Sequence, residues 1–476
     1  MNILFVSPEV FPFAKTGGLA DVAGALPEAI ARKGHKASVI LPYYQLVKKN
    51  GFKPVMFKKN ISVRINNRDE IFNLLLLKHN EVDVYFIEKN EYYDREFLYG
   101  TPQGDYADNA FRFGFYAKAI LASIPLIGRQ DVFHCNDWQS GLLPLYIKLH
   151  HKDDPLFRGA KILYTIHNMA YQGLFMKDVV PYLDISWDLF NQAGVEFWDK
   201  LSFMKTGIVF SDAISTVSRG YAKEILTPEF GCGLDGLLKT REKDLYGIIN
   251  GVDYSVWNPG TDRFIAKKYD ENSLKGKMEC KKDLADAIGI KFDAKRPILG
   301  MITRLAEQKG IDLVVNIMKD ILKDCNFVIL GFGEEKYNNI FQDLAKKYKG
   351  KVGVSIKFDN ALSHKIEAGS DMFLMPSRYE PCGLNQMYSL KYATVPVVRA
   401  VGGLDDTIQN FNPVTKKGNG FKFKDATNEA FLGAIKDAVA VFKNKKLWDG
   451  LLKNCLTCDY SWESSAEQYL KLYKNL

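Results

Sequence analysis

The feature that most constrains the fold of this chain is the repeated alternation of short apolar, β-branched runs with longer helical patterns. Strand-sized apolar runs that alternate with helices predict parallel sheets covered by helices on both faces. Helical patterns fill most of the gaps, for example at Leu19–Lys33, Ile311–Lys323 and Leu384–Tyr392. The runs that we interpret as strands are Ile3–Ser7, Ala37–Leu41, Val82–Ile87, Asp131–Cys135, Lys161–Ile166, Ala213–Val217, Gly247–Asn250, Ile298–Thr303, Phe327–Leu330, Val352–Ile356, Met372–Met375 and Val395–Val398.

These strands are too many for one ordinary doubly wound sheet, so we expect an α/β protein with two Rossmann-like domains in tandem. The chain's 476 residues suit two or three average domains. Turn-forming residues gather at Asn250–Asp253 and Asn258–Gly260, a lysine-rich polar stretch follows, and a fresh α/β series begins at Ile298. A domain boundary is therefore expected in this region. A short internal repeat gives weak support for two related domains, because Gly-Gly-Leu occurs at 17–19 and again at 402–404.

Charge and cysteine content give no support for a nucleic-acid-binding, membrane-binding, disulfide-rich or zinc-binding protein. The 64 basic and 56 acidic residues leave a net charge of +8 without a long block of one sign, so nothing demands a nucleic-acid or membrane partner. Seven cysteines, an odd number in a long chain, fit a reducing compartment better than a disulfide framework. The C-x-x-C at Cys455 and Cys458 lacks a second pair of ligands, so we expect no zinc site.

The N-terminal segment shows no targeting signal. Residues 1–11 lack a basic region ahead of their apolar run, and Glu9 interrupts that run early. No run in the chain approaches about 18 apolar residues, the length that spans a membrane. We therefore expect a cytoplasmic protein without a membrane-spanning helix.

A glycine loop after the first predicted strand is suited to binding phosphate. Adjacent Gly17 and Gly18 let the backbone come close to a ligand with N–H groups pointing at it, and a helix that starts directly afterwards adds its positive end. Lys15 supplies a mobile cation just before the glycines. These parts suit a diphosphate, although a simple strand-to-helix turn explains the two glycines equally well.

A basic loop follows the predicted strand that ends at Thr303. Ligands bind at such strand ends in open parallel sheets. Arg304 offers a two-pronged fork to phosphate, and Lys309, in Gln308-Lys309-Gly310, offers a point charge. The alternative interpretation is a solvated loop with charged residues.

The segment Ser377–Leu384 also follows a predicted strand and runs into a helix. The N–H groups of Gly383 and Leu384 would open that helix and could cap an anion. A phosphate would repel the carboxylate of Glu380, so we assign Glu380 to sugar hydroxyls. The alternative is that Glu380 caps the helix.

A polar cluster at Ile166–Gly173 follows another predicted strand. It contains His167, one of only seven histidines, beside Asn168, Tyr171 and Gln172. A lone histidine is usually structural, but its place among these side chains favours a role in lining a sugar pocket.

Two missing motifs narrow the chemistry further. Gly331-Phe332-Gly333 follows a strand, but Lys336 stands where a dinucleotide fingerprint has its third glycine, so we discount a nicotinamide cofactor. The chain contains no Asp-x-Asp, the carboxylate pair with which many sugar transferases bind a metal ion. We therefore expect no cofactor and no metal, and we expect Arg304 and Lys309 to neutralise the leaving phosphate instead.

Together these motifs resemble those of bacterial glycogen synthases and plant starch synthases, retaining glucosyltransferases of the GT-B fold. The resemblance covers nearly the whole chain, with several long motifs in the same order. Besides the loops above, they are His134–Trp138, Glu229–Leu237, Gly247–Asp253, Val256–Pro259 and Tyr460-Ser461-Trp462. The resemblance implies two Rossmann-like domains facing each other across a deep cleft. They would be an acceptor-side domain at 1–250 and a nucleotide-sugar-binding domain at 251–456, with a final helix at 457–476 crossing back to the first.

The resemblance also implies a reaction, the transfer of glucose from ADP-glucose to the non-reducing end of an α-1,4-glucan with retention of configuration. Lys15 and Gly18 would contact the donor phosphates from one domain, and Arg304 and Lys309 from the other. Glu380 would bind the transferred glucose, and His167 would hold it near the anomeric carbon. The other expected donor contacts are Asp21, Asn250, Gln308, Cys382, Gly383, Leu384 and Asn385, and Asp137 and Asn168 are expected at the reacting centre or acceptor.

Three positions depart from the pattern of this family or of its wider group. The family usually has Thr where Asn385 stands and often has an aromatic residue where Cys232 stands. Tyr388 stands where many related GT-B enzymes have a second glutamate, eight residues after the one at Glu380, and the synthase branch lacks that second glutamate as well.

Two alternatives to the implied function stay open. One is a GT-B transferase with a UDP-sugar donor or a different acceptor. The other is a catalytically silent glucan-binding protein on the same scaffold.

Overall fold

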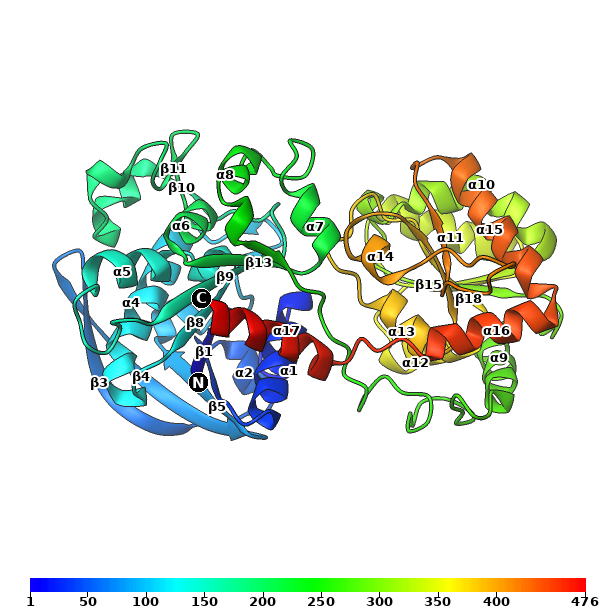
Figure 1. The fold of residues 1–476 in the computed structure, drawn as a ribbon, viewed down its shortest axis with the longest axis horizontal. Coiled ribbons are helices and arrows are strands. Elements are labelled where there is room, and N and C mark those ends of the chain that lie inside the picture. Colours follow the sequence, from blue (N-terminus) through cyan, green and yellow to red (C-terminus); the bar gives the residue numbers. More distant parts are fainter. The chain divides into compact units, whose positions relative to one another are not determined.

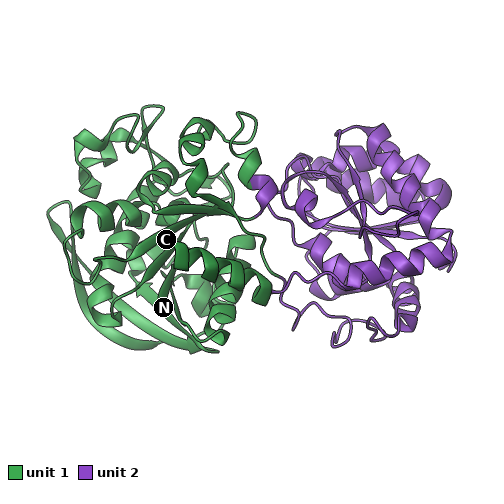
Figure 2. Ribbon diagram, in the orientation of Figure 1, with its two compact units in different colours: residues 1–217, 222–251, 462–476 green, residues 218–221, 252–461 purple.

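Two sheets, each with its own covering helices, organise the chain in the computed structural model, which describes residues 1–476 (Figure 1). The first compact unit contains residues 1–217, 222–251 and 462–476, and the second contains residues 218–221 and 252–461 (Figure 2). The predicted domains, 1–250 and 251–456 with a final helix at 457–476, differ from this division in three places. Residues 218–221 group with unit 2, residue 251 groups with unit 1, and the chain returns to unit 1 at residue 462 instead of 457.

Unit 1 is built on a nine-stranded sheet with the order β14-β13-β9-β8-β1-β2-β5-β4-β3. The strands from β14 to β5 run parallel, and β4 and β3 add an antiparallel hairpin at one edge. The strands are β1 (Asn2–Val6), β2 (Lys36–Pro42), β3 (Val55–Ile65), β4 (Arg68–His79), β5 (Val82–Glu88), β8 (Val132–Asn136), β9 (Lys161–Ile166), β13 (Ala213–Thr216) and β14 (Leu245–Gly247). The helices are α1 (Gly18–Arg32), α2 (Gln45–Lys49), α3 (Asn90–Tyr93), α4 (Asn109–Ile127), α5 (Leu142–His150), α6 (Phe203–Phe210), α8 (Asp235–Thr240) and α17 (Trp462–Asn475), and α7 (Arg219–Glu224) joins the two units.

Short elements that sequence periodicity missed complete unit 1. A small antiparallel sheet is formed by β10 (Leu174–Met176), β12 (Lys200–Ser202) and β11 (Glu196–Phe197), and a second by β6 (Gly100–Thr101) and β7 (Gly104–Asp105). The hairpin β3–β4 was also missed, because β3 is exposed over most of its length and carries polar residues instead of an apolar run. These additions extend loops of the parallel framework without changing its strand order.

Unit 2 has a six-stranded, all-parallel sheet with the order β17-β16-β15-β18-β19-β20. Numbered along the chain, this is the order 3-2-1-4-5-6 of a Rossmann fold. The strands are β15 (Ile298–Ile302), β16 (Asn326–Leu330), β17 (Val352–Ser355), β18 (Met372–Met375), β19 (Val395–Arg399) and β20 (Phe421–Phe423). The helices are α9 (Lys275–Ile288), α10 (Ile311–Asp324), α11 (Glu335–Lys347), α12 (Asn360–Gly369), α13 (Asn385–Lys391), α14 (Gly402–Thr407), α15 (Asn428–Phe442) and α16 (Lys445–Leu456).

Both faces of the unit 2 sheet are covered, as the apolar runs predict. One core packs α10, α11, α15 and α16 against the sheet, and a second packs α9 and α12 against the other face. The parallel strands of unit 1 follow the same order, since β5, β2, β1, β8, β9 and β13 read 3-2-1-4-5-6 along the chain. The expectation of two Rossmann-like domains is therefore confirmed.

Most predicted strands lie within a residue or two of the observed ones, and Met372–Met375 and Lys161–Ile166 coincide with β18 and β9. The prediction for Gly247–Asn250 was wrong in its bounds. There, β14 covers Leu245–Gly247, and the apolar residues beyond it leave the sheet to enter the connection to unit 2.

Helix α4 is long and apolar enough to cross a membrane, although Arg112 and Lys118 interrupt its apolar sequence. Its most apolar window is 72% buried inside the protein. Arg112 within it is fully buried and donates hydrogen bonds to the carbonyls of Tyr92 and Leu98. We therefore describe α4 as a core helix of unit 1.

The final helix α17 belongs to unit 1 through both packing and charge. Arg32 and Lys33, at the end of α1, form ion pairs of 2.8 and 2.7 Å with Glu463 and Glu467. Inside, the Tyr473 hydroxyl lies 2.7 Å from Nδ1 of the buried His134. Strand β8 is thereby packed against the end of the chain.

Candidate active site

In each Rossmann-like sheet the strand order reverses beside the first strand, and this is the place where ligands bind. In unit 2 the reversal lies between β15 and β18. Arg304 follows β15, and the loop from Ser377 to Glu380 follows β18. Two loops that the sequence singled out separately are thus neighbours at the carboxyl edge of one sheet.

A cavity of about 200 Å³ opens at this point of unit 2. It brings together most of the side chains and backbone groups that we expected to bind the donor. Its lining residues are Met301, Ile302, Thr303, Arg304, Lys309, Leu374, Met375, Ser377, Glu380, Gly383, Leu384 and Asn385. Of the expected donor residues in this unit, Gln308 and Cys382 do not line it.

Lys309 and Glu380 form the charged centre of the cavity. The Lys309 Nζ atom lies 2.6 Å from Oε2 of Glu380, and the Ser377 hydroxyl donates to the same oxygen over 2.9 Å. Glu380 is 8% exposed. A nearly buried carboxylate held by a cation and a hydroxyl has a defined position, which a sugar-binding group requires.

The backbone explains why Lys309 reaches Glu380. Lys309 ends the short 3-10 helix η6 (Glu307–Lys309), and Gly310 follows with a φ of +68°. A side chain at Gly310 would place its Cβ 2.1 Å from the Pro376 carbonyl oxygen, so only glycine lets η6 lie against the end of β18. The N–H of Arg378 donates to the Gln308 carbonyl over 2.7 Å and joins the two segments.

Arg304 is exposed, and its guanidinium lies 3.4 Å from the side-chain oxygen of Gln308. The Gln308 side chain donates in turn to the Tyr379 carbonyl. Gln308 therefore orients Arg304 from outside the cavity. An exposed guanidinium in this position keeps donors available for a phosphate.

The Gly383–Asn385 segment closes the other side of the cavity. Gly383 has a φ of +70°, and α13 begins at Asn385, one residue later than predicted. The Asn385 amide donates to the Ile302 carbonyl over 2.9 Å and ties this turn to the end of β15. Cys382 is buried beneath the turn, and its carbonyl accepts from Gln386.

Tyr388 has a packing role where many related enzymes have a glutamate. Its ring stacks on Trp257 with centroids 4.1 Å apart, and the other face of Trp257 stacks on His364 at 4.0 Å.

In unit 1 the strand order reverses between β1 and β8, and the expected residues of this half gather there. After β1 comes the glycine loop, with Gly17 as the N-cap of α1 and Gly18 as its first residue. Lys15 lies 2.6 Å from Asp21, a pair that is partly exposed. Burial raises the pKa of Asp21, although Lys15 opposes the shift.

Glu9 is a member of this loop that the sequence analysis missed. Its carboxylate is buried and accepts the N–H groups of Thr16 and Gly17 over 2.5 and 3.1 Å, together with the hydroxyls of Thr16 and Tyr99. The N–H group of Gly17, one of the two that we expected to face a ligand, is therefore held by a side chain of the same loop. The available signal was an acidic residue in the loop that follows the first buried strand, β1.

Asp137 and His167 follow the neighbouring strands β8 and β9. The Asp137 carboxylate accepts the backbone N–H of His167 over 2.8 Å, and the Asn168 N–H also stabilises it. Burial nevertheless raises the pKa of Asp137 to about 7. Asp137 has a φ of +53° and a ψ of −178°, a conformation that is costly for any residue except glycine and that recurs at functional sites.

His167 is neutral, because burial lowers its pKa to about 3. Its Nε2 atom lies 3.0 Å from Oδ1 of Asn136. The Asn136 Nδ2 group donates to the carbonyls of Val6 and His134, so Oδ1 is the accepting atom and His167 Nε2 carries the proton. Nδ1 of His167 is then an acceptor that suits a sugar hydroxyl.

Two further expected residues of unit 1 have local partners or lie buried. The Asn168 side chain accepts the N–H of Ala170 over 3.0 Å. Asn250 is buried, and its Oδ1 atom has no hydrogen-bond partner.

The structure contains no cluster of three His, Cys, Asp or Glu side chains that could hold a metal ion. Transfer without a metal stays a prediction.

Comparison with known proteins agrees with this architecture. Residues 2–240 match the starch synthase catalytic domain family, and residues 286–445 match the glycosyl transferases group 1 family. A glycogen synthase of Koribacter versatilis is 45% identical over all of this chain and 98% of its own length, and one of Fervidobacterium nodosum is 44% identical over all of this chain and 98% of its own.

Solved structures show the same fold. The catalytic domain of starch synthase IV from Arabidopsis thaliana, bound to ADP and acarbose, has a TM-score of 0.89 and 31% identity, covering 100% of this chain and 99% of its own. Sucrose-phosphate synthase from Thermosynechococcus elongatus has a TM-score of 0.61 and 17% identity over 100% of this chain and 98% of its own, which is a likeness of fold alone. This chain belongs to the family of glycogen and starch synthases, glucosyltransferases with the GT-B fold.

Proposed function

We propose that this glucosyltransferase uses ADP-glucose as its donor and extends the non-reducing end of an α-1,4-glucan with retention of configuration. The observation that supports this most is the cluster of Arg304, Lys309 and Glu380 around one cavity at the carboxyl edge of the unit 2 sheet. Cations suit a diphosphate, and a fixed carboxylate suits sugar hydroxyls. The relative that is 31% identical was solved with ADP bound, which favours this nucleotide.

In the proposed reaction the bond between the anomeric carbon and the diphosphate breaks, and negative charge grows on the leaving diphosphate. Arg304 and Lys309 stabilise that charge more in the transition state than in the ground state. A lysine ammonium has three donors, so Lys309 can hold Glu380 and a phosphate oxygen together. Glu380 accepts hydrogen bonds from the transferred glucose, and Nδ1 of His167 accepts another.

The acceptor hydroxyl attacks the anomeric carbon from the face that the diphosphate leaves. Its oxygen forms the new glycosidic bond, and its proton passes to the departing phosphate oxygen. This same-face path retains configuration without a covalent intermediate on the protein. Asp137 is proposed to stabilise the positive charge that develops at the anomeric carbon.

The proposal also covers further donor contacts, the cellular location and partners. The donor contacts expected in unit 1 stay predictions, namely those of Lys15, Gly18, Asp21 and Asn250. The seven cysteines are free thiols, which supports the proposed cytoplasmic location. Neither a nucleic acid nor a membrane is proposed as a partner.

The donor is tested by following transfer of labelled glucose to glycogen from ADP-glucose and from UDP-glucose. We expect kcat/KM for ADP-glucose to exceed that for UDP-glucose by at least about tenfold, a difference of ~1.4 kcal/mol in transition-state binding. A preference for UDP-glucose would overturn the choice of nucleotide. Glycogen binding without transfer from either donor would instead favour the catalytically silent alternative.

A pH profile tests the proposed role of Asp137. Its pKa of about 7 lies above the ordinary value of 3.8, so its ionised fraction rises as pH increases through 7. If the ionised form stabilises the anomeric charge, kcat/KM, which reports groups of the free enzyme, should rise from about pH 6 to about pH 8. The low pKa of His167 keeps that ring neutral throughout this range.

The matched variant is Asp137→Asn, because asparagine also tolerates positive φ. We expect its kcat/KM to be low and nearly independent of pH over the same range. The assignment fails if the wild-type profile is flat near pH 7, or if the variant keeps the wild-type slope.

A further inference from the structure

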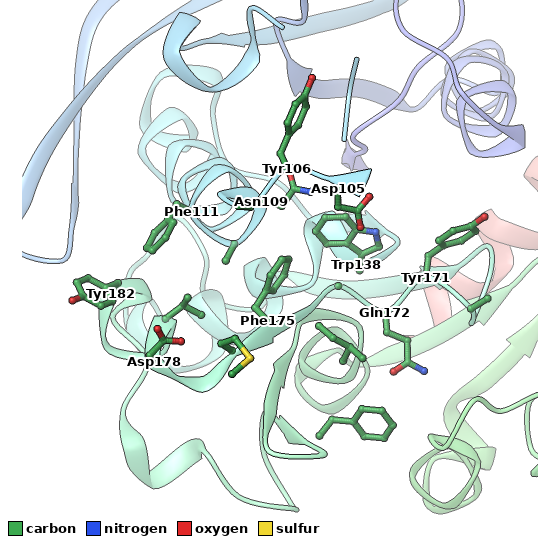
Figure 3. Close-up of a pocket in the computed structure, with 18 of the residues that line it drawn as sticks. Asp105, Tyr106, Asn109, Phe111, Trp138, Tyr171, Gln172, Phe175, Asp178 and Tyr182 are labelled. Atoms are coloured by element: carbon green, nitrogen blue, oxygen red, sulfur yellow. The ribbon is translucent and has the colours of Figure 1, made fainter. Parts of the chain in front are cut away.

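Two cavities larger than the one at Lys309 lie elsewhere in the structure, and their linings differ in charge. One, of about 820 Å³ in unit 1, is lined by aromatic rings and by Asp105 and Asp178, without lysine or arginine (Figure 3). It adjoins the site already described, because Trp138, the residue after Asp137, forms part of its wall. The other, of about 990 Å³, lies entirely in unit 2 and is lined by many lysines. We call it the basic cavity.

The basic cavity has seven lysines and three carboxylates in its lining. The lysines are Lys275, Lys277, Lys281, Lys295, Lys443, Lys445 and Lys453, and the carboxylates are those of Glu271, Asp371 and Asp449. A hollow lined mainly by one sign of charge raises the local concentration of ions of the other sign. The excess of cations therefore favours an anionic ligand.

This cavity lies at the edge of the unit 2 sheet that is opposite to the proposed donor site. Lys295 comes shortly before β15, and Asp371 comes directly before β18, so both mark the amino ends of parallel strands. Arg304 and Glu380 follow the carboxyl ends of the same two strands. A ligand in the basic cavity is therefore distinct from the sugar nucleotide.

Three exposed lysines of the lining, Lys275, Lys295 and Lys453, form no ion pair within the chain. The buried Lys281, by contrast, pairs with Asp371 at 2.9 Å. Each lysine ammonium has three donors, so the three exposed lysines can all donate to phosphate oxygens.

Lys277 contributes a buried charge to the same lining. Its ammonium donates three hydrogen bonds, to the carbonyls of Ala368 and Tyr392 and to the hydroxyl of Thr394. Burial lowers the pKa of Lys277 to about 8, because the charged form is poorly solvated there. An anion bound in the cavity would favour the charged form and would itself be attracted by that charge.

Two helices begin at the basic cavity, and neither has an acidic residue in its first turn. Helix α9 begins at Lys275 and α16 begins at Lys445, and both of these lysines line the cavity. The positive end of a helix dipole disfavours lysine and favours an anion. The N-cap residue of α9, Leu274, has no side-chain oxygen to accept the first N–H groups. A bound phosphate would stabilise both helix ends and reduce the repulsion among the lysines.

One wall of the basic cavity is apolar and consists of Phe442, Trp448 and Leu452. Trp448 is buried and packs edge-on against Phe442, with ring centroids 5.1 Å apart. The Lys281 ammonium lies 5.3 Å from the centroid of the Phe442 ring. An apolar wall beside cations suits a ligand that carries a ring as well as a phosphate.

We propose that the basic cavity binds a phosphorylated small molecule, with its phosphate held by lysines at the starts of α9 and α16 and its ring against Phe442 and Trp448. The ring is that of a nucleoside or of a sugar. The cavity has the volume of sites that hold drug-sized ligands, so it has room for either. The proposal goes beyond the glucosyl transfer, since it involves neither the donor site nor the acceptor.

Labelling with pyridoxal 5′-phosphate tests this site, because the reagent joins a phosphate to a ring and its aldehyde forms an imine with a nearby lysine amine. Borohydride reduces the imine to a stable secondary amine, and peptide mass spectrometry identifies the modified lysines. We expect Lys275, Lys295 and Lys453 to be modified at least about tenfold faster than Lys282. Lys282 is the internal control, because it is an exposed lysine of α9 that does not line the cavity.

Pyridoxal, which lacks the phosphate, is the matched reagent and should modify Lys282 and the cavity lysines at similar rates. Adenosine 5′-monophosphate and ribose 5-phosphate are then added as competitors of pyridoxal 5′-phosphate. Protection of the cavity lysines by the nucleotide alone would assign the site to a nucleoside phosphate, and equal protection by both would assign it to a sugar phosphate. Protection by neither, or equal labelling of Lys282 and the cavity lysines by pyridoxal 5′-phosphate, would overturn the site.

A charge variant tests whether the lysines act together. Lys275→Glu removes one cation and places a carboxylate at the start of α9, where the helix dipole favours it. We expect the labelling of Lys295 and Lys453 by pyridoxal 5′-phosphate to slow at least about fivefold. The matched control is Lys282→Glu, which makes the same change of charge in the same helix outside the cavity and should leave their labelling unchanged. Equal effects of the two variants would contradict a phosphate site at the starts of α9 and α16.

Discussion

Replacing Lys309 with alanine is expected to lower kcat by about 100- to 1,000-fold. The substitution removes a preorganised cation where charge grows on the leaving diphosphate, and loss of one such group typically costs this much. It also leaves the nearly buried Glu380 without its ion-pair partner at 2.6 Å. The measurement is steady-state transfer from ADP-glucose to glycogen, together with the affinity for ADP, which should fall as well.

Two further variants separate charge from geometry at this position. Lys309→Arg keeps the cation and should retain more activity than alanine. Lys443→Ala removes a lysine of the same unit whose pairing with Asp324 is exposed at the surface, and it should leave kcat unchanged. If Lys309→Ala retains activity within about threefold of wild type, the proposed stabilisation of the leaving group is wrong.

Replacing Glu380 with alanine is expected to lower kcat by about three orders of magnitude while the protein still folds. The carboxylate is the group that we assign to the transferred glucose, and it is fixed by Lys309 and Ser377. Because Glu380 is not assigned to the diphosphate, affinity for ADP should stay within about threefold of wild type. The two variants are therefore expected to differ in ADP affinity, which falls in Lys309→Ala and stays nearly unchanged in Glu380→Ala.

The control for Glu380 is Asp343→Ala, which removes an exposed carboxylate of unit 2 that pairs with Lys346 at the surface. It should change neither kcat nor ADP binding. Thermal unfolding of both variants checks that the loss of activity does not come from loss of the fold. Unchanged turnover in Glu380→Ala would remove Glu380 from the sugar site.

The parallel framework could be predicted from sequence because buried parallel strands are continuous apolar runs. Lys161–Ile166 and Met372–Met375 are such runs, and both coincide with observed strands. Residues directly after these strands could then be placed at a sheet edge by topology alone. This is why Arg304 and Glu380, which are far apart in sequence, were both expected in a ligand site.

Other parts depend on contacts that no local pattern reveals. Strand β3 carries Lys58, Lys59 and Asn60 on an exposed edge, so it lacks the apolar run of a buried strand. The role of Glu9 depends on the position of N–H groups seven and eight residues later. A cavity of about 820 Å³ in unit 1, lined by Gln172 among others, forms only when the start of α4 and the turn at Cys232 come together in three dimensions.

The most direct test of the proposed function is the linkage of the product. Wild-type protein is incubated with ADP-glucose carrying labelled glucose and with glycogen, and the purified polymer is digested with β-amylase, which releases maltose from α-1,4-linked non-reducing ends. We predict that the label enters the polymer and is released as maltose. Label that fails to enter glycogen, or that enters and resists β-amylase, would contradict the proposed transfer.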